Sequence, residues 1–244
     1  YVSCCVDKER GMDEQALRDR WQQAIEEIAE AARRAGRPPE DVTLIAVSKL
    51  HPFASIAELA RAGQRDFGEN YVQEALDKQA QASAAPEIRW HFIGRLQTNK
   101  AKFLAGRFHL IHSLDRLKMA QALNKKALEA GIRQSVLLQV NLAGEEQKGG
   151  AAEKDVFTFA EAVHALEGLQ LRGLMCMPPF FDDGERARPY FSGLREVRDR
   201  LQRALGANLS HLSMGMTGDF PQAIQEGATL VRIGTRIFGQ RPEA

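Results

Sequence analysis

One lysine and one arginine stand beside or inside short apolar runs, where a charged side chain is uncommon. Lys49 follows the run at residues 42–47 with only Ser48 between them, and Arg232 lies within the run at residues 230–233. Desolvation lowers the pKa of a lysine and frees its amine for Schiff-base chemistry with a carbonyl compound. A buried guanidinium needs an acceptor, such as a ring nitrogen or a carboxylate. The alternatives are a Lys49 that reaches back to solvent and an outward Arg232 paired with an acid on a neighbouring helix.

Small and hydroxylated residues follow the last two apolar runs. Ser213 and Gly215 come after one of these runs, and Gly234 and Thr235 come after the other. Glycines let backbone N–H groups approach an anion, and a hydroxyl adds a further donor. We therefore predict a phosphate site from these four residues. The alternative is turn glycines with a Ser or Thr helix cap.

Other site chemistries have less support in the sequence. No set of His, Cys, Asp and Glu has the spacing of metal ligands, so no metal site is predicted. His91 lies in an aromatic run and is interpreted as a hydrogen-bonded core residue. His109 and His112 are three apart on a predicted strand, which would place them on opposite faces. Cys176 has no context that marks a nucleophile, and no dinucleotide-type glycine pattern follows the first strand.

The elements that must position Lys49 and Arg232 alternate between strand and helix. An amphipathic helix is predicted at residues 13–35, followed by eight short strands separated by helical stretches. This count predicts a single (β/α)8 TIM barrel, whose sites lie at the carboxyl ends of the strands. A doubly wound open sheet is the alternative, with usually five or six strands. The strands are predicted at residues 42–47, 65–67, 88–93, 109–113, 135–140, 169–175, 208–212 and 229–233, and the stretch 144–150 is predicted to be a loop.

The composition excludes several classes of protein. In the 244 residues, 33 Lys and Arg balance 32 Asp and Glu, which argues against a nucleic-acid-binding protein. No apolar run reaches about 18 residues, so no membrane helix is predicted. Cys4, Cys5 and Cys176 cannot all pair, which favours a reducing, cytoplasmic setting. Residues 1–11 are expected to form a flexible tail, and residues 12–244 the barrel domain.

Several strings resemble motifs of the pyridoxal phosphate homeostasis family, and they come in the same order. The resemblance covers about residues 13–240, and the linked motifs together make it specific. Two departures, Leu50 where many members carry Thr or Tyr and Arg95 where Pro is also common, touch neither the lysine nor the phosphate groups. The matching strings are AVSK at residues 46–49, FGEN at 67–70, WHFIG at 90–94 with 96–97 and 99–100, SMGM at 213–216 with Asp219, and VRIGT at 231–235 with 237–239.

This resemblance implies a barrel like the N-terminal domain of alanine racemase, the type III fold of enzymes that use pyridoxal 5′-phosphate (PLP). PLP would bind at the mouth of the barrel as a Schiff base on Lys49, with Arg232 facing the pyridine nitrogen and Asn70 near the ring. The resemblance assigns the phosphate to Ser213, Gly234 and Thr235, with Met214 and Gly215 lining the phosphate loop.

An arginine beside the pyridine nitrogen keeps that nitrogen unprotonated and makes the ring a poorer electron sink. A racemase would also need a second acid or base across the ring, which a tyrosine of a separate β-domain supplies in alanine racemase. None of Tyr1, Tyr71 and Tyr190 follows such a domain, and only residues 240–244 come after the last motif. We therefore expect no robust catalysis and no assigned catalytic residue.

The expected function is a monomeric PLP carrier in vitamin B6 homeostasis that exchanges PLP with amino acids or apo-enzymes. One alternative is a weak amino-acid racemase or another PLP-dependent enzyme. Another is a barrel hydrolase or isomerase that acts on a phosphorylated metabolite without PLP.

Overall fold

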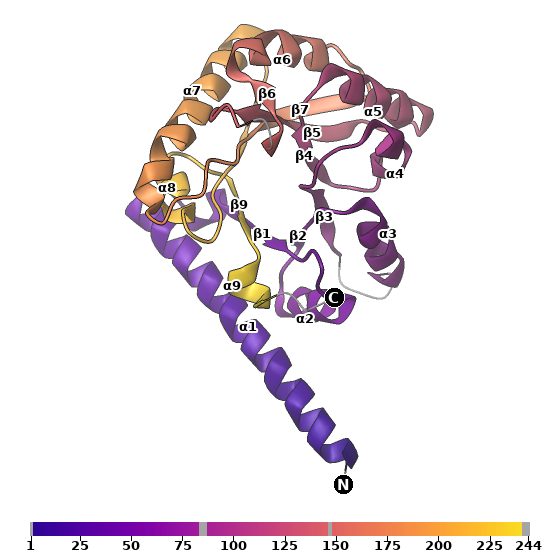
Figure 1. Cartoon of the computed structure of the whole chain (residues 1–244), viewed down its shortest axis with the longest axis vertical. Coiled ribbons are helices and arrows are strands. Elements are labelled where there is room, and N and C mark those ends of the chain that lie inside the picture. Colours follow the sequence, from indigo (N-terminus) through magenta and orange to yellow (C-terminus); the bar gives the residue numbers. More distant parts are fainter. Residues whose placement is uncertain (1, 83–86, 146–147, 241–244) are drawn as a thin grey trace.

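Eight parallel strands close into a barrel in the order β1-β2-β3-β4-β5-β7-β8-β9, and β9 pairs with β1 again. The structure is a computed structural model that describes residues 2–82, 87–145 and 148–240, with side chains described from residue 13 onward. The predicted (β/α)8 barrel is confirmed (Figure 1). The strands are β1 (Thr43–Val47), β2 (Asp66–Glu69), β3 (Arg89–Phe92), β4 (Leu110–Leu114), β5 (Gln134–Asn141), β7 (Leu169–Met175), β8 (His211–Ser213) and β9 (Leu230–Ile233).

Helices surround the ring of strands on its outside (Figure 1). The two-residue strand β6 (Ala151–Ala152) pairs with β5 directly after the predicted loop at residues 144–150. The helices are α1 (Val2–Arg34), α2 (Phe53–Ala62), α3 (Val72–Gln81), α4 (Ala101–Leu104), α5 (Leu117–Glu129), α6 (Val156–His164), α7 (Arg188–Leu205), α8 (Phe220–Gln225) and α9 (Thr235–Phe238), with 3-10 turns η1 (Pro39–Asp41), η3 (Thr98–Lys100), η5 (Glu153–Asp155) and η6 (Gly184–Ala187).

Helix α1 begins at Val2, whereas the apolar periodicity predicts a start at residue 13. Its first turns extend beyond the barrel in Figure 1 and pack against no neighbouring element there. A helical segment that extends away from the rest of the molecule needs no apolar stripe, so periodicity could not reveal these turns. The side chains of residues 1–12 lie outside the described residues, and the division into a flexible tail and a barrel domain stays a prediction.

The remainder of α1 is fixed to the barrel next to β1 and β9. The Trp21 indole donates to the Gln64 side chain at 2.9 Å, and Arg20 donates to the carbonyl of Ile237 at 2.7 Å. The helix packs against α2, α8 and α9. These contacts anchor α1 to the helices that follow β1 and β9, the strands next to Lys49 and Arg232.

The hydrophobic core has two parts. The larger part lies between the barrel and its helices, and the smaller part, with Ile45, Leu137 and Met175, lies inside the barrel. Strands with apolar residues on both faces can fill both parts, which explains the unbroken apolar runs of the sequence. The barrel interior is not wholly apolar, because His112 and Arg232 are buried there as well.

None of the helices in the described part of the chain combines the length and the apolar character that a membrane span requires. Residues 2–82, 87–145 and 148–240 likewise contain no group of three or more His, Cys, Asp and Glu side chains that could hold a metal ion.

Candidate functional site

Lys49 lies at the carboxyl end of β1, where barrel sites are built. Ile45 faces the barrel interior, and strand alternation continues that face through Val47 towards Lys49. The lysine is half-buried and begins a turn. Leu50, which follows it, has a φ of 63° and is the single described non-glycine residue in the left-handed region. Such backbone strain is common at functional sites and needs support from its surroundings.

That support comes from a buried ionic cluster behind β1, which the sequence did not reveal. Ser48 donates from its hydroxyl to Glu69 at 2.6 Å, and its carbonyl accepts from Lys78 at 2.8 Å. Lys78 also pairs with Glu69 and Glu74, each at 2.7 Å. The backbone N–H of Leu50 donates to Glu74 at 2.5 Å. The backbone on both sides of Lys49 is therefore held from the side of β2 and α3.

The carboxylate at the centre of this cluster is fully buried. Burial raises the pKa of Glu69 even though Lys78 and Ser48 donate hydrogen bonds to it. The spacing of Glu74 and Lys78, four residues apart on α3, was the one signal in the sequence for a partner of this kind. Lys78 is committed to two carboxylates, which leaves Lys49 as the candidate for Schiff-base chemistry at the end of β1.

Arg232 faces the interior of the barrel, so the inward orientation considered from the sequence is the observed one. It lies opposite Ile45 in the register of β9 with β1 and is 5% exposed. Its guanidinium donates to the Ser213 hydroxyl at 2.7 Å and to the Cys176 carbonyl at 3.0 Å. Burial lowers the pKa of Arg232. Both acceptors are neutral groups. A guanidinium has five N–H donors, so Arg232 has donors left for a ligand.

The loop after β8 contacts β9 at Arg232. The backbone N–H of Arg232 donates to the carbonyl of Gly215 at 3.0 Å, which joins this loop to the strand. Gly215 has a φ of 91°, and a Cβ at this position would lie 2.7 Å from the Cβ of Ala223. A Cβ on Gly234 would lie 3.3 Å from the Val47 carbonyl oxygen. The chain therefore runs close to its neighbours at both glycines.

The short helix α9 begins directly after Gly234, with Thr235 as its first residue. The first N–H groups of a helix have no partner within it. Loops after the last two barrel strands, together with a short extra helix, are the usual position of a phosphate in barrels of this type. Gly215, Gly234 and Thr235 thus lie where a phosphate could be bound by backbone N–H groups.

Two other residues assigned to the phosphate by the resemblance lie differently. The Ser213 side chain is fully buried in the barrel, where it contacts Arg232 and, at 2.8 Å, His112. The Met214 side chain is fully buried in the core between barrel and helices. Only the backbone of Met214 faces the loop, so its role at a phosphate stays a prediction, as does that of Ser213.

Asn70 follows β2 and lines a cavity of about 410 Å³ at the mouth. Its side-chain oxygen is buried and has no hydrogen-bond partner among the described residues. Unsatisfied buried acceptors are rare in proteins, and a ligand or water is a common missing partner. The cavity is also lined by Tyr71, Val72, Gln73, Phe92, Arg95, Gln97 and Lys100.

Three histidines, His91, His109 and His112, lie close together at β3 and β4. His91 bonds to Asp66 and to His112, each at 2.9 Å, which confirms its interpretation as a hydrogen-bonded core residue. The prediction that His109 and His112 lie on opposite faces is wrong, because both rings contact His91, with centroids 5.5 Å and 5.2 Å away. His109 precedes the first residue of β4, so strand alternation does not govern its direction.

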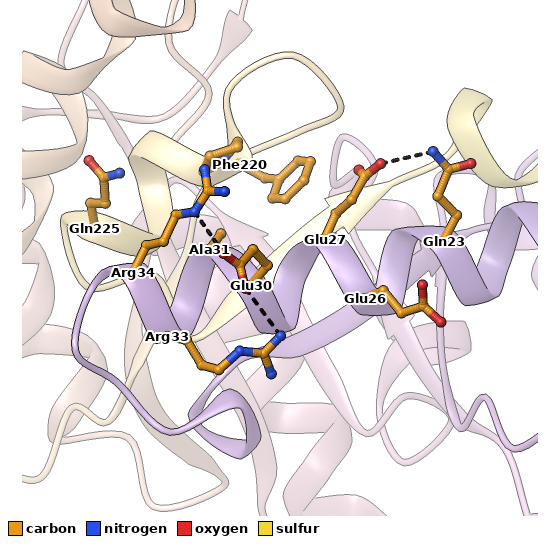
Figure 2. A pocket seen from close by; sticks show the side chains of 10 residues that line it. Gln23, Glu26, Glu27, Glu30, Ala31, Arg33, Arg34, Phe220 and Gln225 are labelled. Carbon is orange, nitrogen blue, oxygen red and sulfur yellow. Dashed lines mark hydrogen bonds and ion pairs between the residues drawn. The ribbon is translucent and has the colours of Figure 1, made fainter.

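A larger cavity, of about 660 Å³, lies elsewhere, between α1 and α8 on the flank of the barrel. Figure 2 shows Glu30 of this cavity paired with Arg33 and Arg34, and Glu27 bonded to Gln23. None of the residues predicted for the site lines it. Size alone therefore does not mark the functional site of this barrel.

A family model described as alanine racemase, N-terminal domain, matches residues 17–242. The chain belongs to this family. Curated members named pyridoxal phosphate homeostasis protein match nearly end to end, which confirms the predicted resemblance. The protein from Aquifex aeolicus is 46% identical over 223 residues, 91% of this chain and 97% of the relative. The protein from Pseudomonas aeruginosa is 49% identical over 216 residues, 88% of this chain and 91% of the relative.

A solved structure with PLP bound also matches this chain in three dimensions. PipY of Synechococcus elongatus, solved with PLP bound, is 40% identical and superposes with a TM-score of 0.78. The match covers 87% of this chain and 100% of PipY. The alanine racemase-type barrel that the motifs predict is therefore the fold of this chain.

Proposed function

We propose that this chain binds PLP at the mouth of its barrel, as a reversible Schiff base on Lys49, and serves in intracellular PLP homeostasis. The names of its relatives and the PLP bound in PipY support the ligand. The observation that carries the proposal is the inward, buried Arg232, which lies on β9 in register with the strand that ends at Lys49.

The residues present fit the group. Arg232 has donors left for a ring nitrogen, and the Asn70 side-chain oxygen lacks a partner among the described residues. The two glycine loops and Thr235 place backbone N–H groups within one corner of the mouth, as a phosphate requires. Bound there, PLP would supply an aldehyde that reacts reversibly with a lysine amine and a ring that accepts electron density.

The residues of the chain have separate tasks in this proposal. Lys49 supplies the amine, and the cluster of Glu69, Glu74 and Lys78 holds the backbone around it. Arg232 donates to the ring nitrogen and disfavours a proton there, because two positive charges would lie side by side. An unprotonated ring withdraws fewer electrons, so the site favours holding PLP over carbanion chemistry.

The experiment is an absorption spectrum of the PLP-loaded protein before and after borohydride, followed by peptide mapping. We expect a yellow protein whose label maps to Lys49, and Lys49→Ala should lose both the colour and the label. Lys100→Ala, at the rim of the cavity beside Asn70, is the matched control and should keep both. A reduced adduct on Lys78 or Lys100 in the wild-type protein would overturn the assignment.

A weak amino-acid racemase is the second candidate, because Tyr71 lines the same cavity as Asn70 and is 53% exposed. Tyr190, on α7, stacks instead against Phe181. Incubation of the PLP-loaded protein with L-alanine in deuterated water separates the two functions. A carrier leaves the Cα hydrogen in place, whereas a racemase exchanges and racemises it, and Tyr71→Phe would then abolish the exchange.

The proposed setting is the cytoplasm, with amino acids and apo-enzymes of PLP as exchange partners and a monomer as the working state. The free, buried Cys176 suits a reducing compartment. Light scattering of the PLP-loaded protein tests the monomer. Transfer of PLP to an apo-enzyme held behind a dialysis membrane, compared with direct mixing, tests whether exchange needs contact.

A further inference from the structure

A continuous series of hydrogen bonds crosses the barrel interior from Asp66 to Arg232. Asp66 accepts from His91 Nε2 at 2.9 Å, and His91 Nδ1 lies 2.9 Å from His112 Nε2. His112 Nδ1 lies 2.8 Å from the Ser213 hydroxyl, which lies 2.7 Å from Arg232. All five residues are buried, each at most 5% exposed. We call Asp66, His91, His112, Ser213 and Arg232 the polar column.

The two ends of the polar column determine the direction of every bond in it. Burial acts to raise the pKa of Asp66, but hydrogen bonds from His91 and Arg89 outweigh it and lower the pKa to about 2. Asp66 is therefore a carboxylate and only accepts, whereas Arg232 only donates. Arg232 thus donates to Ser213, Ser213 to His112 Nδ1, His112 Nε2 to His91 Nδ1, and His91 Nε2 to Asp66.

The opposite arrangement fails at two places. If His112 carried its proton on Nδ1, His91 would have to donate from both ring nitrogens and be a cation. The Ser213 proton would then have no acceptor within the column. Burial also lowers the pKa of His112 well below its ordinary value, and the charges of His91 and Arg232 would oppose a proton there. Two neutral imidazoles, each with its proton on Nε2, satisfy all four ring nitrogens and give the Ser213 proton an acceptor.

This order aligns the bond dipoles along the column. Each group donates towards Asp66 and presents a lone pair towards Arg232, so the bonds polarise one another in the same sense. Arg232 needs such compensation, because its two hydrogen-bond acceptors in the described part of the chain are neutral. The column thus links a buried guanidinium at the mouth to a carboxylate deep in the barrel.

We propose that Asp66, His91 and His112 are positioning residues that act through Ser213 to hold the Arg232 guanidinium in place against the PLP ring. The contact with the ring rests on the proposed function, whereas the polarity of the column does not. In this proposal Ser213 accepts a hydrogen bond from Arg232, so the Ser213 hydroxyl is engaged inside the barrel. Other charged and titratable groups around the two imidazoles are Arg89, His109, Arg172 and His211, from β3, the residue before β4, β7 and β8.

Nitrogen-15 NMR of the imidazoles tests the polarity on the protein without PLP. His91→Gln and His112→Gln spectra assign the two signals. We expect each ring to carry a proton on Nε2 and a lone pair on Nδ1 at pH 8. An Nδ1–H form of His112, or a His91 with protons on both ring nitrogens at pH 8, would overturn the proposal, whatever the protein does with PLP.

Paired substitutions of His112 test the positioning. In His112→Asn, the amide oxygen takes the position of Nδ1 and can accept a hydrogen bond from Ser213. In His112→Gln, the amide nitrogen takes the position of Nε2, so this variant keeps only the hydrogen bond to His91. We expect His112→Gln to weaken PLP binding about tenfold, as the loss of one hydrogen bond does, and to shift the absorbance of bound PLP. His112→Asn should restore both towards wild type.

His109→Asn is the control, because its ring contacts His91 without joining the column. Equal effects of all three substitutions on PLP binding, or none from His112→Gln, would overturn the positioning role. If the NMR result holds and wild-type protein takes up no PLP, the proposed function fails while the polarity of the column stands. If His112→Gln does not fold, the wild-type spectrum assigned with His91→Gln and His109→Asn still decides the polarity.

Discussion

Ser213 and Arg232 lie on the neighbouring strands β8 and β9, and their side chains meet 2.7 Å apart inside the barrel. A serine hydroxyl that accepts from a buried guanidinium cannot be assigned from the motif alone, because the family resemblance also assigns this serine to the phosphate of PLP. The contact ties the group that would face the PLP ring to the polar column beneath it. Under the proposed function, substitutions of Ser213 or Arg232 should therefore affect the binding and the spectrum of PLP more than they affect the fold.

Replacing Arg232 by Glu should alter the spectrum of bound PLP. A carboxylate beside the ring nitrogen favours a proton on that nitrogen, whereas Arg232 opposes it. Loss of the charged donor should also weaken PLP binding by about 10-fold to 100-fold, as expected for a charge-assisted hydrogen bond. Absorbance titration with PLP measures both effects. Arg203→Glu on the exposed face of α7 should change neither, and an unaltered spectrum in Arg232→Glu would show that Arg232 does not contact the ring.

Replacing Gly215 by Ala should disturb the phosphate corner. The φ of 91° is unfavourable for alanine, and the new Cβ would lie 2.7 Å from the Cβ of Ala223. We expect the free energy of unfolding to fall by roughly 1–3 kcal/mol and PLP binding to weaken. Gly218→Ala in the same loop is the matched control, because its Cβ would meet nothing within 4 Å. Urea denaturation and PLP titration of both variants measure the difference, and equal stability of the two would contradict the strain.

The barrel could be predicted from sequence because each strand is a short apolar run between helical stretches. The run at residues 229–233 predicts β9 (Leu230–Ile233) to within one residue, although Arg232 interrupts it. Helix α9 could not be predicted in this way, because four residues after a strand show no helical period. The first turns of α1 could not be predicted either, because they extend away from the barrel in Figure 1 and show no apolar periodicity.

The site could be predicted in part. Lys49, Arg232 and the two glycine loops stand at strand ends in the sequence, and the closed barrel brings those ends together. The polar column could not be predicted, since its members come from β2, β3, β4, β8 and β9 and their bonds depend on register. The Glu69 cluster could not be predicted either, because an ion pair between two neighbouring elements leaves no periodic pattern in the sequence.

Removing the cation of that cluster should destabilise the protein. Lys78→Met leaves the fully buried Glu69 without its ion-pair partner, and breaking a buried pair from one side typically costs roughly 3–5 kcal/mol of unfolding free energy. The double variant with Glu69→Gln removes the stranded charge and should recover part of that loss. Urea denaturation of the wild type, both single variants and the double variant measures the coupling. A double variant as unstable as Lys78→Met would show that Glu69 is not the stranded group.

The stability of the barrel should fall as the pH drops from about 6.5 to 4, and His211 should account for part of the loss. Burial and the charge of Arg172 lower the pKa of His211 to about 4, below the ordinary value of 6.5. The unfolded chain therefore binds this proton first, so the stabilisation is complete above pH 6.5 and is lost as the pH falls towards 4. Asp66, with a pKa of about 2, keeps its own contribution until the pH is well below 4.

Urea denaturation at pH 7.5 and pH 4.5 separates the histidine from the carboxylate. The wild type should lose roughly 1–3 kcal/mol through His211 over this interval, and His211→Gln, which cannot take up the proton, should lose correspondingly less. His164→Gln on the exposed face of α6 is the control and should follow the wild type. Parallel pH profiles for His211→Gln and the wild type would place the acid sensitivity elsewhere, with the fully buried His112 as the next group to replace.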